Sequence, residues 1–266
     1  MFSAERCTVI LGDIRTRRPL VHNITNYVVM NNTANALLAL GASPAMVHSI
    51  EEVEEFVALS SALVINIGTL SPSWVEAMGK AVRAATARGI PWALDPVGAG
   101  ATAYRTTTSA ALARLGPACV RGNASEIMVL AGATADKTRG VDTSRGSDDA
   151  LDAARQLART TGAVVAVTGA VDHVTDGTQL ISLANGHPLM ARVTGLGCTA
   201  TALVGAALAV EPDRLAAVAA GLSYLAIAGE IAAENSPGPG SLQLHLLDAL
   251  HLLDAATIQR RLKIVP

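Results

Sequence analysis

Short runs of β-branched and apolar residues alternate with longer Ala- and Leu-rich segments along most of the chain. The short runs predict strands at 19–23, 44–48, 62–67, 91–95, 118–121 and 163–168. The longer segments predict helices near 26–40, 51–60, 72–88, 106–115, 124–131 and 147–160. Strands that alternate with helices pair in parallel through crossover connections, so the pattern predicts repeated βαβ units around a mostly parallel sheet. Three of these helices have candidate N-caps, at Asn26, Ser71 and Asn123.

The alternation ends in the last part of the chain. Asp176-Gly177 lies between the β-prone runs 171–175 and 179–183, which predicts an antiparallel hairpin at one edge of the sheet. Helices are then expected at 197–210, 212–234 and 242–261. The Pro- and Gly-rich segment 235–241 precedes only one of them, so we interpret it as a loop inside a single domain that spans 1–266. The polar stretch 136–149 is predicted to be a surface loop that could border a nucleotide site.

The composition narrows the possible partners. Apolar residues make up 50% of the chain and charged residues 16%, so we expect extensive burial within the fold or between subunits. Aromatic residues make up 3%, and 20 Lys and Arg stand against 22 Asp and Glu without a basic cluster, which argues against nucleic acid. Cys7, Cys119 and Cys198 are too far apart for a disulfide framework or metal motif and fit a reducing compartment. With no signal peptide or uninterrupted apolar run of about 18 residues, we expect a cytoplasmic protein without a membrane partner.

The segment Thr194-Gly195-Leu196-Gly197-Cys198 joins a β-prone run to a strongly helical stretch. Glycine allows the backbone to turn tightly and to approach a ligand, and the free amides of a helix N-terminus favour an anion. Because phosphoryl transfer depends mainly on positioning and charge neutralisation, this turn could hold a transferring phosphoryl group. An ordinary strand-to-helix turn explains the same spacing.

Cys198 would lie in the first turn of the helix that follows. The helix N-terminus favours the thiolate, so a pKa below the usual value of about 8.5 is expected, and the thiol could then act as a base. The alternative is a small residue whose sulfur only fills space in the core.

Acidic residues follow two successive predicted strands. Asp95 ends the run 91–95 at the edge of the sheet where ligands bind, and it could hold Mg²⁺ while the amides of Gly98 and Gly100 face an anion. A turn-forming Asp-Pro pair explains the same residues. Glu126 follows the next strand, and two acids at neighbouring strand ends favour a metal site over either one alone.

Near Glu126 lie two further candidates, Arg121 and Asn123. Arg121 could neutralise phosphate oxygens, and Asn123 could cap the helix in which Glu126 stands three residues later. A capping box with a solvated arginine remains the alternative. At the first predicted strand, the dense amides of His22-Asn23-Ile24-Thr25-Asn26 could recognise a polar ligand, although such residues also end strands and begin helices. Met46 could contact an apolar ring or belong to the core.

Several segments together resemble one enzyme family. They are LVHNITNY (20–27), ANALL (34–38), GASPAM (41–46), NIGTL (66–70), DPVGAGAT (95–102), RGNASE (121–126) and GPGS (238–241). In this order they resemble the hydroxyethylthiazole kinase family, ribokinase-like enzymes that phosphorylate the hydroxyl of 4-methyl-5-(2-hydroxyethyl)thiazole in thiamin salvage.

The resemblance implies a three-layer ribokinase-like sandwich with a mostly parallel central sheet and a helical C-terminal part. It also implies ATP and Mg²⁺ as cofactors, and usually a homotrimer with the thiazole site near subunit contacts. The implied ATP-binding residues are Arg121, Thr168 and Asn123. The implied Mg²⁺ residues are Asp95 and Glu126. The implied thiazole-binding residues are Met46, Asn23 and Gly195, and the implied catalytic turn consists of Gly195, Gly197 and Cys198.

Two positions of the turn distinguish this chain from relatives. Cys198 stands where many ribokinase-like kinases have aspartate, which argues against a sugar kinase and against a nucleotide-dependent dehydratase of the same fold. Leu196 stands where the family often has threonine, so this chain lacks that hydroxyl near the phosphate. The alternatives that remain are a kinase for hydroxymethylpyrimidine or pyridoxal, the dehydratase, and a non-catalytic protein that binds thiazole or nucleotide.

Overall fold

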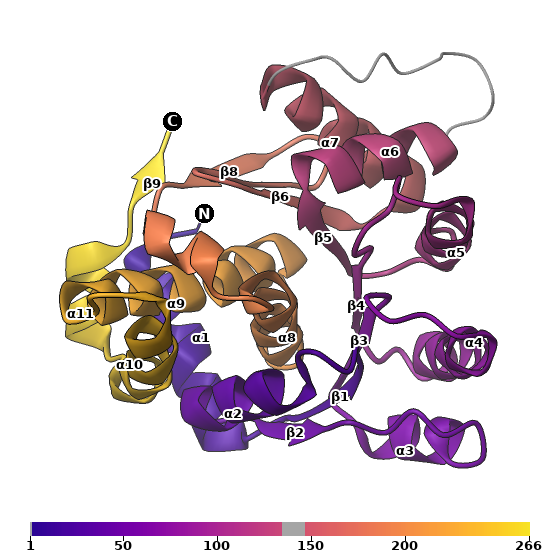
Figure 1. The fold of residues 1–266 in the computed structure, drawn as a ribbon, viewed down its shortest axis with the longest axis horizontal. Helices are drawn as coiled ribbons and strands as arrows, with labels where there is room; N and C mark the ends of the chain where they lie inside the picture. The colour runs from indigo at the N-terminus through magenta and orange to yellow at the C-terminus, as the bar shows by residue number, and fades with distance from the viewer. Residues whose placement is uncertain (1, 135–146) are drawn as a thin grey trace.

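The computed structural model of the chain describes residues 2–134 and 147–266. Most of the polar stretch 136–149, for which a surface loop was predicted, lies outside the described residues. The described part is an α/β fold in which helices cover both faces of one large sheet (Figure 1).

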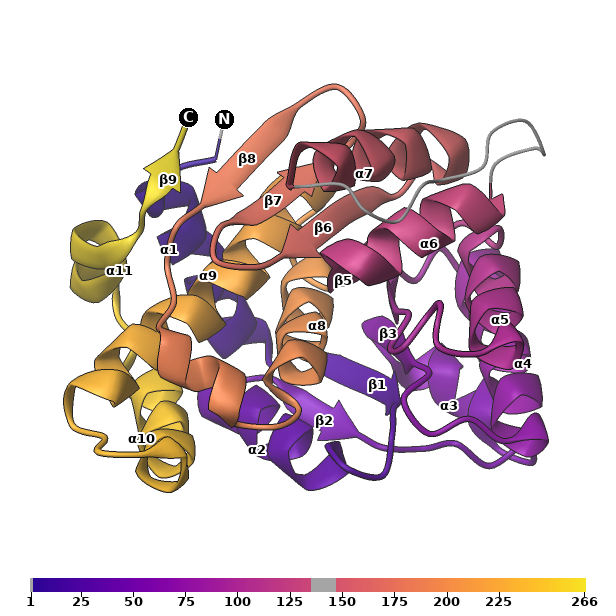
Figure 2. The same cartoon turned by 45° about the horizontal axis from the view of Figure 1, so that its top comes forward.

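The sheet of the described residues has nine strands in the order β2-β1-β3-β4-β5-β6-β7-β8-β9. Neighbours from β2 to β6 are parallel, and those from β6 to β9 are antiparallel. The strands are β1 (Leu20–Ile24), β2 (Ser43–Ala45), β3 (Ala62–Asn66), β4 (Trp92–Asp95), β5 (Cys119–Asn123), β6 (Val164–Thr168), β7 (Asp172–Thr175), β8 (Leu180–Leu183) and β9 (Ile264–Val265). The predicted mostly parallel sheet and the hairpin at its edge are therefore confirmed, and Figure 2 shows β7 and β8 beside β6.

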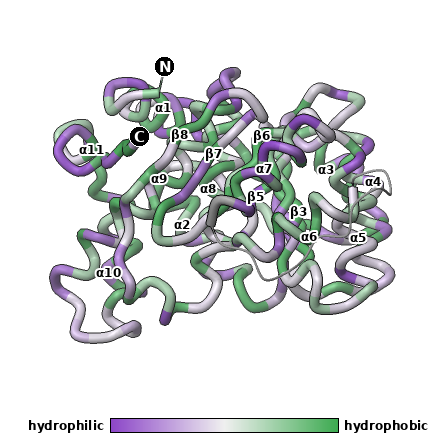
Figure 3. Tube along the Cα trace, turned by 90° about the horizontal axis from the view of Figure 1, so that it is seen from above, coloured by the Kyte–Doolittle hydropathy of each residue, from purple (hydrophilic) through white to green (hydrophobic). Residues whose placement is uncertain are grey.

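Two layers of helices enclose the sheet, each with its own hydrophobic core. The first layer consists of α1 (Ala4–Arg17), α2 (Met30–Leu40), α8 (Leu196–Leu208), α9 (Arg214–Glu234), α10 (Pro239–Leu252) and α11 (Ala255–Arg261). The second consists of α3 (Val53–Leu59), α4 (Pro72–Ala87), α5 (Ala103–Ala113), α6 (Ala124–Thr134) and α7 (Ser147–Thr161). A short 3-10 helix, η1 (Pro188–Arg192), connects β8 to the segment before α8. In Figure 3, hydrophobic colour lies along α8 and α9, and the outer α11 is more hydrophilic.

Of the described helices, α9 alone is long and apolar enough to cross a membrane. However, 83% of its most apolar window is buried inside the protein. Such burial is typical of a core helix. Gly221 allows the close packing of α9 on α8, because a Cβ at this position would lie 2.6 Å from Cα of Val204.

Several predicted boundaries are wrong. α1 and β9 have no counterpart among the predicted elements, and the strand predicted at 44–48 is shorter and lies at Ser43–Ala45. The single helix predicted at 242–261 is two helices, because the chain is extended at Leu253 and Asp254 then caps α11 by accepting from the amide of Thr257 (2.8 Å).

The predicted caps had different outcomes. Ser71 caps α4 as expected, accepting from the amide of Trp74 at 3.3 Å. Asn26 does not cap α2, because that helix begins at Met30 and its N-cap position is Val29, without a side-chain hydrogen bond. The side chain of Asn26 instead points toward Asn66 and Cys198.

Candidate active site

Polar residues lie at or near the carboxyl ends of four neighbouring strands, all on the face covered by α8. These residues are Asn66, Asp95, Arg121 and Thr168. In each strand, the residue two positions before them belongs to the hydrophobic core on the α8 side of the sheet, so strand alternation places all four side chains on that side. The parallel register sets Asn66 directly beside Asp95. The side chains therefore form one row on this face. Asn66, Asp95 and Arg121 follow one another across the register, and Thr168 lies two residues further along β6 than the partner of Arg121.

Asp95 is the buried centre of this row, with 0% of its surface exposed. Its Oδ2 accepts hydrogen bonds from Nδ2 of Asn66 (2.9 Å) and Oγ1 of Thr201 (2.8 Å), and Nη1 of Arg121 lies 4.0 Å away. Burial raises the pKa of Asp95 to about 6, although Arg121 and the two hydrogen bonds act in the opposite direction. Oδ1 has no partner among the described residues. A buried, unpaired carboxylate oxygen is unusual and marks a place where a cation or a donor can bind.

The turn before α8 has the tight geometry that its glycines allow. Gly195 has a φ of +81°, in the left-handed region, and a Cβ there would lie 2.5 Å from Cγ1 of Val29. A Cβ on Gly197 would lie 2.6 Å from Nη1 of Arg121. The first amides of α8 have no acceptor within the helix, so together with the helix dipole they favour an anion. The predicted glycine turn is present, and its use by a phosphoryl group stays a prediction.

Arg121 lies directly against this helix N-terminus, with 14% of its side chain exposed. Its Nη2 donates to Oγ1 of Thr168 (2.6 Å), and its Nε has no partner among the described residues. Asp95 is the only carboxylate of the described residues within ion-pair distance of the guanidinium. The guanidinium and the positive end of the helix dipole thus meet at one point, and an anion bound there would relieve their repulsion.

The expectation of a lowered pKa for Cys198 is wrong. Burial and, less strongly, the nearby carboxylate of Asp95 raise the pKa of this thiol to about 11, because together they outweigh the opposite effects of the hydrogen bonds and of Arg121. The thiol is therefore protonated at neutral pH. Of the three cysteines, Cys7 and Cys119 are fully buried, and all three are free.

A chain of asparagine side chains connects the thiol to the carboxylate. Nδ2 of Asn26 donates to Oδ1 of Asn66 (2.8 Å) and to Sγ of Cys198 (3.5 Å), and Asn66 donates in turn to Asp95. Neither Asn66 nor Thr201 is among the site residues expected from the sequence. Signals for both were present, because Asn66 ends an apolar strand as Asp95 does, and Thr201 lies one helical turn after Cys198.

Glu126 and Asn123 form the predicted capping box at the start of α6. Oδ1 of Asn123 accepts from the amide of Glu126 (3.0 Å), and Oε2 of Glu126 accepts from the amide of Asn123 (2.9 Å). Oε1 of Glu126 accepts from the amide of Gly98 (2.8 Å), and the amide of Gly100 donates to Oγ1 of Thr106 (2.9 Å). Both amides are therefore used by side chains of the protein, and the expectation that they face a bound anion is wrong.

Asp95 and Glu126 provide carboxylate oxygens, the ligand type that a hard divalent cation prefers. Oδ1 of Asp95 is unpaired, and Glu126 is close enough to raise the pKa of Asp95. Among the described residues there is no group of three His, Cys, Asp or Glu that could hold a metal ion alone. Mg²⁺ commonly takes one or two carboxylates and completes its shell with water and phosphate oxygens, so the two acids fit it on those terms.

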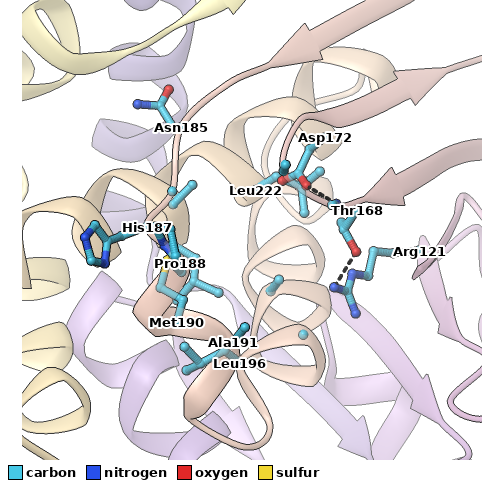
Figure 4. Close-up of a pocket in the computed structure, with 17 residues that line it drawn as sticks. Arg121, Thr168, Asp172, Asn185, His187, Pro188, Met190, Ala191, Leu196 and Leu222 are labelled. Atoms are coloured by element: carbon cyan, nitrogen blue, oxygen red, sulfur yellow. Dashed lines mark hydrogen bonds between the residues drawn. The ribbon is translucent and has the colours of Figure 1, made fainter. Parts of the chain in front are cut away.

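A pocket of about 550 Å³ opens beside this row of residues. Arg121 and Thr168 lie on one side of it and His187 and Met190 on the other (Figure 4). The wall toward α8 and α9 is aliphatic, and is formed by Leu196, Ala200, Leu222, Leu225 and Ala226. A pocket with one cationic end and one apolar wall suits a ligand with charged phosphates and a flat apolar ring, and its volume is in the usual range of about 300–1,000 Å³.

Asn23 and Met46 form a second group at the ends of β1 and β2, which the parallel register sets side by side. Asn23 is 1% exposed, its Nδ2 donates to its own strand, and its Oδ1 has no partner among the described residues. Met46 is half-buried. Among the described residues no hydrogen bond joins Asn23 or Met46 to Cys198, so the structure does not bring them into the same network as Asp95 and Arg121.

Known proteins resemble this chain in sequence and in structure. The sequence model of the Hydroxyethylthiazole kinase family matches residues 11–256. A protein of Syntrophus aciditrophicus (strain SB) named hydroxyethylthiazole kinase is 57% identical over 253 residues, which is 95% of this chain and 94% of that protein. A solved structure of a hydroxyethylthiazole kinase protein from Pyrococcus horikoshii OT3 superimposes with a TM-score of 0.91 at 44% identity, over 98% of both chains. A ribokinase-like superfamily protein from Enterococcus faecalis V583 has a TM-score of 0.62 at 14% identity, over 87% of this chain and 86% of that one, so the ribokinase-like fold is confirmed.

Proposed function

The chain belongs to the hydroxyethylthiazole kinase family, and we propose that it transfers the γ-phosphoryl group of ATP to the hydroxyl of 4-methyl-5-(2-hydroxyethyl)thiazole, a step of thiamin biosynthesis and salvage. One observation carries the proposal. The guanidinium of Arg121 and the free amides of α8 converge at the edge of the 550 Å³ pocket, where Asp95 offsets only part of their positive charge. The triphosphate of a nucleoside triphosphate such as ATP would supply the negative charge that this arrangement lacks.

In this proposal the base and ribose of ATP occupy the pocket between η1 and α9, and the phosphates point toward α8. Arg121 and Thr168 contact the phosphates, and Asn123 lies beside them at the start of α6. Support comes from the hydrogen bond between Arg121 and Thr168 and from their shared position on the lining of the pocket. Leu196 supplies an apolar surface instead of a hydroxyl, so the backbone amides of the turn carry the contacts with the phosphate.

Asp95 and Glu126 would hold Mg²⁺ together with phosphate oxygens and water. When bound, this ion would neutralise charge on the phosphates. Asp95 contributes a buried oxygen, Oδ1, that has no hydrogen-bond partner among the described residues. Glu126 already accepts from two backbone amides, so its second role is to keep the loop after β4 close to α6.

The thiazole alcohol would bind beside Cys198, with Met46, Asn23 and Gly195 around the ring and its hydroxyethyl arm. The alcohol oxygen attacks the γ-phosphorus, the bond from phosphorus to the bridging oxygen breaks, and ADP leaves. The amides of α8 and Arg121 stabilise charge on the transferring oxygens. Because the thiol is protonated at neutral pH, we propose that Cys198 orients the alcohol as a neutral neighbour. The hydroxyl proton then passes, late in a loose transition state, to an oxygen of the transferred phosphoryl group, which releases it to water.

We also propose that 1–266 acts as one kinase domain and assembles as a homotrimer in the cytoplasm. Tyr27 and Val28 are 66% and 65% exposed and directly follow Asn26, so an apolar surface borders the site and could contact another subunit. The three free cysteines fit a reducing compartment. Light scattering after size-exclusion chromatography would give the oligomeric state.

The test of the proposed function is a competition between alcohols. Purified protein with Mg²⁺ and ATP should convert hydroxyethylthiazole to its phosphate, detected by mass spectrometry, faster than hydroxymethylpyrimidine or pyridoxal. Preferred phosphorylation of one of the other two alcohols would overturn the assignment of the substrate but keep the kinase. Binding of ATP and thiazole without any phosphorylated product would overturn the assignment of the enzyme.

A further inference from the structure

Arg105 lies in the first turn of α5, on the opposite side of the sheet from α8. This is an unfavourable place for a cation, because the N-terminus of a helix carries the positive end of the dipole. None of the described carboxylates lies within ion-pair distance of its guanidinium. A first-turn arginine without an acidic partner must be held by other groups, and the structure identifies them.

The guanidinium donates three hydrogen bonds to backbone carbonyls of two different loops. Nη1 donates to the carbonyls of Ile67 (2.9 Å) and Val97 (2.8 Å), and Nη2 donates to the carbonyl of Gly68 (2.8 Å). These loops follow β3 and β4, whose last backbone contact is the bond from the amide of Ile67 to the carbonyl of Asp95 (3.3 Å). Beyond that bond, Arg105 is the group that joins the two loops among the described hydrogen bonds.

Each loop supports one side of the candidate site. In the loop after β3, the amide of Gly68 donates to Oδ1 of Asn66, and a Cβ at Gly68 would lie 2.6 Å from Nδ2 of Asn26. Asn26 in turn contacts Cys198. In the loop after β4, the amide of Gly98 donates to Glu126, close to Asp95. The separation of the two loops therefore sets the separation of the thiol side and the carboxylate side of the site.

An arginine is required for this contact pattern. Its planar fork presents several N–H groups in fixed directions and reaches carbonyls of both loops at once, whereas the ammonium of lysine is a single point on a flexible stem. The stem also packs closely on the turn, since a Cβ at Gly98, where φ is +73°, would lie 3.3 Å from Cδ of Arg105. The side chain is thus fixed along its length as well as at its end.

We propose that Arg105 is a positioning residue for phosphoryl transfer, which it serves by fixing the spacing of the loops after β3 and β4 through the carbonyls of Ile67, Gly68 and Val97. Arg105 does not line the 550 Å³ pocket, and its guanidinium donates only to backbone carbonyls among the described residues, so its effect is on the alignment of the groups that line the site. The proposal rests on the proposed kinase function. Misplacement of reacting groups by about 1 Å can lower the rate of a bound complex by about a hundredfold.

The experiment compares Arg105→Lys and Arg105→Ala with a matched control, Arg114→Lys. Arg114 is the C-cap of the same helix and also donates to a backbone carbonyl, that of Ala133 (2.7 Å), but it is remote from the site. For Arg105→Lys we expect kcat to fall about tenfold or more while KM for ATP changes by less than about threefold, because alignment is lost and the nucleotide pocket is not touched. Arg114→Lys should keep wild-type kcat. The folded fraction is measured by circular dichroism at the assay temperature.

Two further readouts separate positioning from stability and from the assigned activity. Guanidinium ion at about 10–50 mM should restore part of the kcat of Arg105→Ala, but sodium chloride of equal ionic strength should not, because only guanidinium replaces the fork. If the wild type phosphorylates no alcohol, the proposed function fails, but the loop contact can still be tested by the rate of Cys198 alkylation. Arg105→Lys should change this rate by about threefold or more, and Arg114→Lys should not change it. The positioning role is overturned if folded Arg105→Lys keeps at least half of the wild-type kcat, if the loss matches the unfolded fraction, if guanidinium restores nothing, or, without kinase activity, if alkylation is unchanged.

Discussion

Replacement of Asp95 by asparagine should lower activity while making the protein relatively more stable at higher pH. The asparagine Oδ1 can still accept the two hydrogen bonds from Asn66 and Thr201, so the shape of the site is kept. What disappears is a buried negative charge. If that charge holds Mg²⁺ beside the phosphates, we expect kcat to fall by about a hundredfold or more.

The size of the stability effect follows from the pKa of Asp95. Burial raises it from 3.8 to about 6, even against the attraction of Arg121. Between pH 5 and pH 8 the folded protein loses a proton that the unfolded chain has already lost, so this group lowers the free energy of unfolding as the pH rises. The decrease over that range amounts to about 1.4 kcal/mol in the wild type. Asp95→Asn lacks this group, so its stability relative to the wild type should rise by the same amount.

Urea unfolding of both proteins at pH 5 and pH 8, without Mg²⁺, measures this difference, and a kinase assay at pH 8 measures kcat. The comparison between the two pH values cancels the constant effect of the amide. If the stability difference is the same at pH 5 and pH 8, the carboxyl does not have a raised pKa. If Asp95→Asn keeps at least a third of the wild-type kcat, Asp95 has no part in catalysis.

Three other predictions test the turn, the thiol and the core. The rate at which iodoacetamide alkylates Cys198 should rise about tenfold for each pH unit up to about pH 10, because the pKa of the thiol is raised to about 11. Mass spectrometry measures this rate, and a plateau below pH 9 would contradict the raised pKa. Gly197→Ala should lower kcat/KM for ATP about tenfold or more, because the new Cβ would displace the guanidinium of Arg121. The control is Gly12→Ala, where a Cβ would have no atom within 4 Å. It should leave the kinetics unchanged and raise the free energy of unfolding by about 0.5–1 kcal/mol. Tyr224→Phe should lower the free energy of urea unfolding by about 1 kcal/mol through loss of the 2.8 Å hydrogen bond to a carbonyl in α1, and an unchanged unfolding midpoint would refute that contribution.

Local patterns in the sequence predict most of the fold. The hairpin is an example, because Asp176-Gly177 between two β-prone runs leads to the turn between β7 and β8. α1 was missed although its buried residues Cys7, Ile10, Leu11 and Ile14 have helical spacing. β9 has only two residues and is a strand only because β8 lies beside it, which no local pattern shows.

The candidate site was predicted in part for the same reason. Asp95, Arg121 and Thr168 lie on the same face of the sheet, at or near the carboxyl ends of successive strands. Strand alternation and a parallel sheet are therefore enough to bring them together. The direction of Asn26 could not be read locally, because an asparagine at this position can cap a helix or bind a distant partner, and Asn66 lies 40 residues away.

The sequence by itself determined the parallel sheet, the glycine turn and the row of strand-end residues, since these depend on periodicity and on the backbone freedom of glycine. Only the tertiary structure decided the pKa values of the ionisable groups in the site. Cys198 stands at a helix N-terminus, which would lower its pKa, but burial and the carboxylate of Asp95, 103 residues earlier in the chain, raise it instead. The helix dipole acts within one turn of the chain, whereas burial and neighbouring charges depend on which distant segments pack together, and this second contribution is the larger one here.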